Sequence, residues 1–171
     1  MKILVFSDSH GRSSNMIKAI SLHHDARLVV HLGDGTFDAE EAKKLFPDLP
    51  FVCVSGNLED ALHPLKKSVP FQVVTEENKT IYLCHGHRHN VSFTEQNLIY
   101  AAAERGADLI LYGHTHVKDN RYIPENQETG RKSTYLFNPG SISRPRDGGY
   151  PSYGVIELRA EGILLSHGII K

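Results

Sequence analysis

Five short segments of the sequence combine carboxylate, amide or imidazole side chains with small residues, and each follows an apolar run. They are Asp8-Ser9-His10, Gly33-Asp34, Gly56-Asn57, His85-Gly86 and Gly113-His114-Thr115-His116. Oxygen and imidazole groups are ligands of divalent cations, and a neighbouring glycine lets the backbone turn sharply and a metal approach closely. If the five segments converge, seven side chains meet: two carboxylates, one amide and four imidazoles.

This donor set predicts two metal ions. A single ion takes about four to six ligands, so seven suit a pair of ions better. The set is too rich in nitrogen for Mg²⁺ or Ca²⁺ alone and has no thiolate, so we expect Mn²⁺, Fe²⁺, Zn²⁺, Co²⁺ or Ni²⁺, with Mn²⁺ as the leading candidate. Turn chemistry explains each Asp or Asn at a strand end singly, but not the four imidazoles as well.

The first half of the sequence predicts the elements that position three of these segments. Apolar runs at residues 3–6, 27–32 and 51–55 predict buried strands. Helical patterns lie between them, at residues 38–46 and from a cap at Ser13 or Ser14 to His23. This alternation indicates βαβ units and a parallel sheet, and ligands bind outside the carboxyl ends of such strands.

The second half follows a different pattern. Residues 71–75 and 80–84 predict a hairpin, and residues 108–112 a buried strand. Ser92 and Glu95 form a capping box that predicts a helix to Arg105. Later, mostly antiparallel strands are predicted at residues 121–123, 133–137, 153–158 and 163–166.

Composition bounds the function. The 171 residues predict one domain, residues 1–171, and 40% hydrophobic content is ordinary for a globular protein. Nineteen Lys and Arg against 20 Asp and Glu give a net charge of −1, which argues against general binding to nucleic acid or an anionic membrane. We expect a cytoplasmic protein because the N-terminus lacks the plan of a signal peptide and no apolar run spans a bilayer. Cys53 and Cys84 are expected as reduced, buried thiols.

The order D-x-H, G-D, G-N, H-G, G-H-x-H resembles that of the calcineurin-like metallophosphoesterases. The short length and the Asn138-Pro-Gly-Ser141 segment are similar to their small bacterial and archaeal phosphodiesterase branch. The resemblance runs from Lys2 to about Ser141. It implies an α/β fold, a four-layer αββα sandwich in which two mixed β-sheets pack face to face with helices outside.

The resemblance also implies roles for the seven residues. Asp8, His10 and His116 would hold one metal ion, Asn57, His85 and His114 the second, and Asp34 would bridge them. The implied activity is a phosphodiesterase in which a hydroxide trapped between the metals attacks phosphorus. Asp34, Asn57 and His85 are therefore the predicted catalytic residues. Two divalent ions bring +4 and two aspartates return −2, which leaves a pocket suited to a small phosphodiester substrate.

One position departs from the family pattern. Many members have His after the G-N asparagine, where it protonates the leaving group, but this chain has Leu58. Leucine donates no proton, so we expect good leaving groups such as phenolates or strained cyclic phosphates to be cleaved best, unless His87 or His89 substitutes. Arg144 and Arg146, in the Pro/Gly-rich loop 138–151, either bind substrate phosphate or are solvated loop charges.

Two alternative functions remain at this stage. A phosphomonoesterase has the same metal ligands, and the retromer subunit of eukaryotes uses the fold as a protein-interaction scaffold. Scaffold relatives tend to have lost ligand positions, so the complete set favours an enzyme. The resemblance also suggests a homo-oligomer, with a dimer as the expectation. His31 is expected either as a hydrogen-bonded core residue or as a residue that supports the metal ligands, and no role is expected for His23, His24, His63 and His167.

Overall fold

The computed structural model describes residues 1–62 and 68–171, which form two mixed five-stranded sheets. The first sheet has the order β10-β9-β1-β2-β3, in which β1, β2 and β3 are parallel and β9 pairs antiparallel with both of its neighbours, β1 and β10. Its strands are β1 (Lys2–Phe6), β2 (Leu28–His31), β3 (Phe51–Cys53), β9 (Ser152–Arg159) and β10 (Gly162–Ile169).

The second sheet has the order β4-β5-β6-β8-β7. Strands β5, β6 and β8 are parallel to one another, and β4 and β7 pair antiparallel at the two edges. Its strands are β4 (Phe71–Glu76), β5 (Lys79–Cys84), β6 (Leu109–Leu111), β7 (Lys118–Ile123) and β8 (Thr134–Pro139). The hairpin and the mostly antiparallel later strands were predicted correctly, but the parallel pairing of β8 with β6 was not foreseen.

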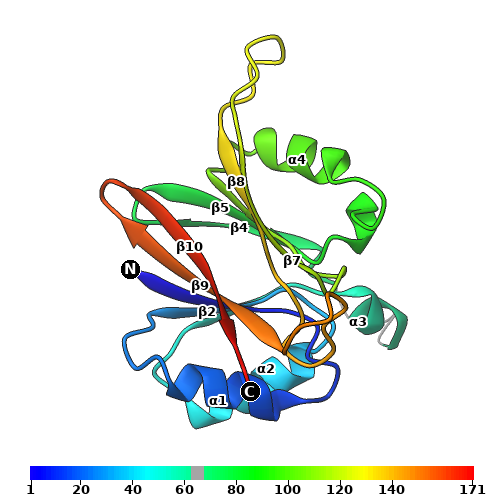
Figure 1. The fold of residues 1–171 in the computed structure, drawn as a ribbon, viewed down its shortest axis with the longest axis vertical. Coiled ribbons are helices and arrows are strands. Elements are labelled where there is room, and N and C mark those ends of the chain that lie inside the picture. The colour runs from blue at the N-terminus through cyan, green and yellow to red at the C-terminus, as the bar shows by residue number, and fades with distance from the viewer. Residues whose placement is uncertain (63–67) are drawn as a thin grey trace.

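The two sheets form the inner layers of a four-layer sandwich, as the resemblance implied. Helices α1 (Ser13–Ser21) and α2 (Thr36–Leu45) cover the outer face of the first sheet, and α4 (Gln96–Ala103) covers the second (Figure 1). Successive side chains of a strand point to opposite faces, so Ile3 and Val5 enter the core between the sheets while Leu4 and Phe6 pack under the helices. Burial on both faces explains the continuous apolar runs.

Several element boundaries differ from the sequence predictions. Arg12, not Ser13 or Ser14, occupies the cap position of α1. The capping box was wrong: α4 begins at Gln96, whose backbone N–H donates to Thr94 Oγ1 (3.3 Å), because Ser92 lies in a preceding turn. The short helices α3 (Asn57–Leu62) and η1 (His87–His89) were missed.

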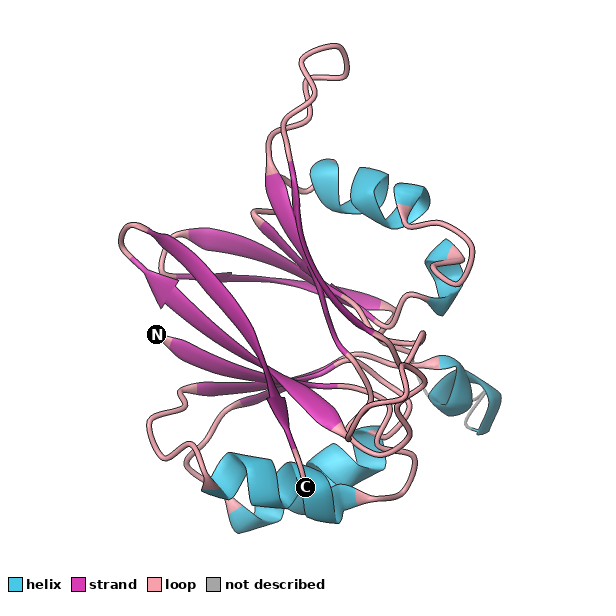
Figure 2. Cartoon of the chain, viewed as in Figure 1, coloured by secondary structure: helices cyan, strands magenta, loops and turns pink. Residues whose placement is uncertain are grey.

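The loops that follow the parallel strands gather at one end of the sandwich, on the right of Figure 2. Of the two cysteines that were expected to be buried, one is less buried than predicted. Cys53 is half-buried and Cys84 buried, and both are free thiols. Within residues 1–62 and 68–171, every helix is too short or too polar to cross a bilayer.

Candidate metal centre

The five predicted segments converge at this end of the sandwich. Asp8 and His10 follow β1, Asp34 follows β2, and Asn57 opens α3 after β3. From the second sheet, His85 follows β5, and His114 and His116 follow β6. Carboxyl ends of neighbouring parallel strands share one edge of a sheet, so the topology brings the two halves of the centre face to face.

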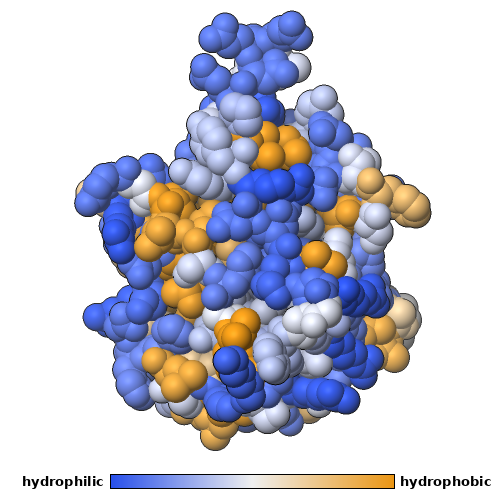
Figure 3. Space-filling model, in the orientation of Figure 1, coloured by the Kyte–Doolittle hydropathy of each residue, from blue (hydrophilic) through white to orange (hydrophobic). Residues whose placement is uncertain are grey.

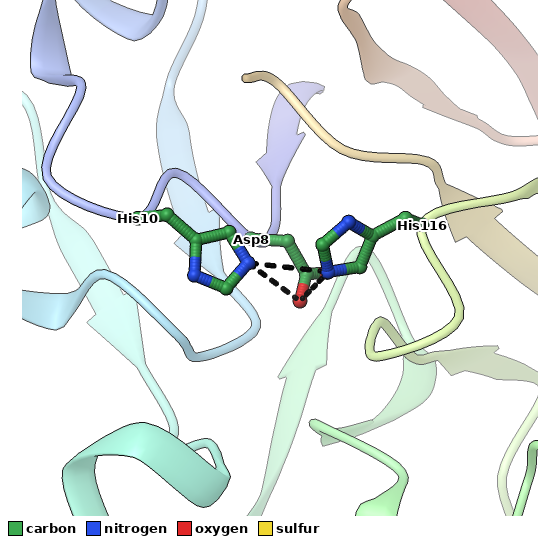
Figure 4. A group of neighbouring side chains, drawn as sticks. All are labelled: Asp8, His10 and His116. Atoms are coloured by element: carbon green, nitrogen blue, oxygen red, sulfur yellow. Dashed lines mark hydrogen bonds and ion pairs between the residues drawn. The ribbon is translucent and has the colours of Figure 1, made fainter. Parts of the chain in front are cut away.

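The first group contains Asp8, His10 and His116. The Nε2 atoms of His10 and His116 lie 3.1 Å apart, and Asp8 Oδ1 is 3.2 Å from His116 Nε2 and 3.9 Å from His10 Nε2 (Figure 4). Asp8 and His116 are buried and His10 is half-buried. These three ligand atoms are close enough to bind one ion together.

The second group lies next to the first. Asn57 Oδ1 is 3.2 Å from His85 Nε2 and 3.1 Å from His114 Nδ1. His85 Nε2 is also 3.6 Å from Asp34 Oδ1 and 3.9 Å from Asp8 Oδ1. The ligand atoms of Asp8, Asp34 and His85 all lie within 4.8 Å of one another, so Asp8 of the first group and Asp34 both lie beside the second group.

Backbone carbonyls fix the ring orientation of two of the histidines. The Nδ1–H of His85 donates to Leu32 O and that of His116 to Arg144 O, each at 2.7 Å. A carbonyl only accepts, so Nδ1 carries the proton, and in the neutral ring Nε2 is left with a lone pair. Histidines that bind metals are held in this way, with the second nitrogen bonded to a carbonyl or carboxylate.

One oxygen at the middle of the centre lacks a partner. Asp8 Oδ2 accepts the backbone N–H of His114 (3.1 Å), but among the described residues no group donates a hydrogen bond to the buried Oδ1. Three imidazole Nε2 atoms, those of His10, His85 and His116, lie within 3.9 Å of it. Imidazole lone pairs and a carboxylate in such contact repel unless a cation lies between them, either a proton on a ring nitrogen or a metal ion. The mixture of imidazole nitrogens and carboxylate oxygens fits divalent metal ions.

The pKa shifts of Asp8 and His116 also indicate that positive charge is stabilised at the centre. Burial disfavours the charged His116 ring, but its contact with Asp8 and its hydrogen bond to the Arg144 carbonyl together outweigh burial and raise the His116 pKa. Burial alone would raise the pKa of Asp8, yet His116 and His85 lower it below its ordinary value. The carboxylate is therefore ionised at neutral pH and stabilises cations beside it.

Five of the seven candidate residues have a left-handed backbone. Such φ values cost non-glycine residues about 1–3 kcal/mol each and cluster at functional sites. The residues and their φ values are Asp8 (56°), His10 (49°), Asp34 (54°), His114 (70°) and His116 (61°). Packing between the loops enforces these turns: a Cβ on Gly56 would lie 2.1 Å from Asp34 Oδ1, and one on Gly33 would lie 2.5 Å from Gly56 N.

Comparison with known proteins places this centre in a family. Residues 1–161, which include all seven candidates, match the profile of the calcineurin-like phosphoesterase superfamily domain. The chain belongs to the calcineurin-like phosphoesterase superfamily. Membership supports a metal-dependent hydrolase of phosphate esters.

Curated relatives agree with this assignment. The chain is 31% identical over 161 residues to the probable metallophosphoesterase YsnB of Bacillus subtilis. The alignment covers 92% of this chain and 85% of that protein. It is 28% identical over 176 residues to phosphodiesterase YfcE of Escherichia coli K12, with 92% and 88% covered.

Solved structures share the fold. A predicted phosphoesterase from Streptococcus pneumoniae superposes with a TM-score of 0.77 at 25% identity, over 98% of this chain and 88% of that one. The zinc complex of Vps29 from Entamoeba histolytica superposes with a TM-score of 0.69 at 19% identity, over 99% of both chains. The second likeness shows the fold alone.

In this phosphoesterase, a carboxylate that the sequence analysis did not single out connects the loops of the centre. The Glu59 side chain accepts four backbone N–H groups, from Asp34 (2.8 Å), Gly35 (2.7 Å), Thr36 (3.0 Å) and Gly56 (2.7 Å). Burial would raise its pKa, but these donors lower the pKa to about 2, so it is always charged near neutrality. Its position two residues after Asn57, in the G-N-x-E pattern, was the available signal.

A second carboxylate supports the turn between Asp8 and His10. Asp38 Oδ2 accepts the Ser9 hydroxyl (2.5 Å) and the Gly11 backbone N–H (2.9 Å). His31 is buried, and its Nε2 lies 3.1 Å from Ser9 Oγ, which agrees with its expected role in the core. An acidic residue in the first turn of a helix is common for electrostatic reasons alone, so Asp38 gave no signal in the sequence.

The segment from Asn138 onward supports the second half of the phosphoesterase centre. Asn138 Nδ2 donates to Gly113 O (3.0 Å), and the Ser141 and Ser143 hydroxyls donate to Asp8 O (2.8 and 2.9 Å). Arg144 O accepts from His116, as described above. The buried polar residues of this loop therefore hold the backbone on both sides of the centre.

The remaining sequence candidates lie at different distances from the centre. The His87 ring centroid is 5.3 Å from that of His85, and His87 Nε2 is 3.1 Å from Asp60 Oδ2. His89 Nε2 is 3.4 Å from the Tyr82 hydroxyl. The side chains of Arg144 and Arg146 are exposed.

The histidines for which no role was expected have structural partners or lie at the surface. His23 Nε2 is 3.0 Å from the Tyr153 hydroxyl, and His167 Nε2 donates to Asn138 O at 2.8 Å. His24 is exposed, and His63 lies outside the described residues.

Proposed function

We propose that this phosphoesterase is a dinuclear, metal-dependent phosphodiesterase. Asp8, His10 and His116 would bind one ion, Asn57, His85 and His114 the other, and Asp34 would bridge them, with Mn²⁺ as the leading ion. The observation that carries the proposal is the buried Asp8 Oδ1, which has three imidazole nitrogens within 3.9 Å and, in the described part of the chain, no hydrogen-bond donor.

The residues of the chain prepare the site for a phosphate ester. Metal ions held by these seven residues would supply Lewis acidity, which lowers the pKa of water and neutralises charge on a phosphate ester. Two divalent ions would carry four positive charges, whereas Asp8 and Asp34 carry two negative ones. The pocket would therefore keep a net positive charge and attract an anionic substrate. The carbonyls that hold His85 and His116 keep the ligand geometry fixed and reduce reorganisation during the reaction.

A diester is favoured over a monoester by the surroundings of the centre. A cleft beside His10 is lined by Phe37, Leu58 and Leu62, and apolar walls suit an ester arm better than a free phosphate oxygen. Arg144 lines the same cleft and would contact the phosphate with its guanidinium, as would Arg146 from the same loop. The phosphodiesterase named among the relatives supports the same substrate class.

The test is metal-dependent hydrolysis of two matched esters. Protein stripped with a chelator is expected to be inactive, and Mn²⁺ is expected to restore hydrolysis of bis(p-nitrophenyl) phosphate to a kcat/KM at least about tenfold above that for p-nitrophenyl phosphate. Restored activity that favours the monoester would make the protein a phosphomonoesterase. If neither ester were hydrolysed with any of the five candidate metals, the result would support a protein-interaction scaffold.

The Leu58→His variant tests the missing proton donor. Leu58 follows Asn57 and lines the cleft beside His10, where the family histidine would stand. A general acid helps most when the leaving group is a poor one, so the variant should raise kcat for an alkyl leaving group by about tenfold and change that for p-nitrophenolate little. The control is Leu58→Gln, which adds polarity without a titrating group. An equal gain in both variants, or none, would contradict this role.

A further inference from the structure

A cleft of about 290 Å³ lies beside the first group of the metal centre and has two unlike walls. One wall carries His10 and the exposed side chain of Arg144. The other is formed by Phe37 at the start of α2 and by Leu58 and Leu62 of α3. Apolar surface is visible over α3 at the lower right of the space-filling view (Figure 3).

The apolar wall is unusually exposed for large hydrophobic side chains. Phe37 is 68% exposed, Leu62 70% and Leu58 37%. Single exposed apolar residues need no explanation, but three that line one cleft beside a reactive centre mark a binding surface. An apolar group that covers them would gain free energy in proportion to the area it removes from water.

The two carboxylates that line this cleft, Asp38 and Glu59, already accept hydrogen bonds, which narrows the choice of ligand. Asp38 Oδ2 accepts from Ser9 and Gly11, and both carboxylate oxygens of Glu59 accept backbone N–H groups. These carboxylates are therefore poor partners for the hydroxyls of a sugar. The backbone of Arg144 is fixed by Ser141 and His116, while its guanidinium faces solvent. A guanidinium both pairs with phosphate and stacks on aromatic rings.

We propose, building on the proposed phosphodiesterase function, that this cleft binds a planar aromatic group attached to one ester oxygen of the substrate. The ring would stack on Phe37, with Leu58 and Leu62 beside it, and Arg144 would contact the phosphate. A lipid chain would extend beyond a wall of three side chains, and a bare sugar would find few free polar partners. The aromatic group is either an aryl ester or a nucleobase.

The test measures binding rather than turnover, so it does not depend on whether the protein hydrolyses diesters. Phenylphosphonate and methylphosphonate are titrated by calorimetry into Mn²⁺-supplemented protein; the two probes share a head group and differ by the ring. We expect phenylphosphonate to bind about tenfold more tightly, and Phe37→Ala to reduce the ratio to about twofold. Phe93→Ala removes an aromatic ring that is even more exposed (91% against 68% for Phe37) and lies outside the cleft, so it should leave the ratio unchanged.

Each other outcome is decisive. Equal binding of the two probes by the wild type, or a ratio that Phe37→Ala does not change, would overturn the proposal. So would a change in oligomeric state on Phe37→Ala with unchanged binding, because the surface would then be an interface between copies. Adenosine 5′-monophosphate and ribose 5-phosphate separate the two sources: a Phe37-dependent preference for the first indicates a nucleotide, and its absence an aryl ester.

Discussion

Replacing Asp34 by asparagine is expected to lower kcat for bis(p-nitrophenyl) phosphate by on the order of a thousandfold, about 4 kcal/mol of transition-state stabilisation. Asp34 Oδ1 accepts the Leu58 backbone N–H (2.9 Å) and lies 3.6 Å from His85 Nε2. Asparagine keeps the shape and the Leu58 contact. It removes the negative charge, however, and replaces a ligand oxygen by an NH₂ group with no lone pair to offer.

The measurement that accompanies the rate is the metal content of the protein after extensive buffer exchange. We expect the Asp34→Asn variant to retain fewer ions than the two per chain that the proposed dinuclear site assigns to the wild type, because a bridging ligand would contribute to both sites. Asp48→Asn removes the same charge from an exposed loop and should leave both the rate and the metal content unchanged. Full metal content together with full activity in Asp34→Asn would show that the carboxylate does not bridge.

Part of the convergence of the seven candidates could be predicted because the information that carries it is local. Runs such as residues 3–6 are apolar on every side chain, so they must be buried on both faces, and a polar residue after them must mark the strand end. Right-handed βαβ connections then place Asp8, Asp34 and Asn57 at one sheet edge. His85, His114 and His116 were grouped with them because they too follow apolar runs, although nothing in their spacing indicates that a second sheet brings them opposite the first.

The details that could not be predicted depend on contacts between loops. A left-handed φ at Asp8 or His116 is unfavourable in isolation, and only the surrounding packing selects it. Helix α3 begins at Asn57 although its six residues have no strong helical pattern. Its start is set by Glu59, which binds the Gly56 N–H and the loop after β2 at once. At Ser92 the local signal was present, but a turn stabilised by the left-handed Asn90 overrode it.

Glu59→Gln is expected to show the largest loss of stability among single polar substitutions at this centre. All four lone-pair sites of the carboxylate are filled by backbone N–H groups. The amide keeps one accepting oxygen and places an NH₂ group against the other two donors. Two N–H groups then lack an acceptor, which costs about 2–4 kcal/mol and lowers Tm by about 5–15 °C.

This variant also separates support of the fold from support of the site. Glu59 touches none of the proposed ligand atoms, but it fixes the backbone of Asp34 and the residue before Asn57. Well below Tm, where circular dichroism shows a folded protein, the variant should still bind Mn²⁺ about 10–100-fold more weakly. Glu40→Gln, on the exposed face of α2, is the matched control and should change neither quantity. If Glu59→Gln lowered Tm but bound Mn²⁺ as the wild type does, the carboxylate would support only the fold, and the ligand positions of Asp34 and Asn57 would be held by other contacts.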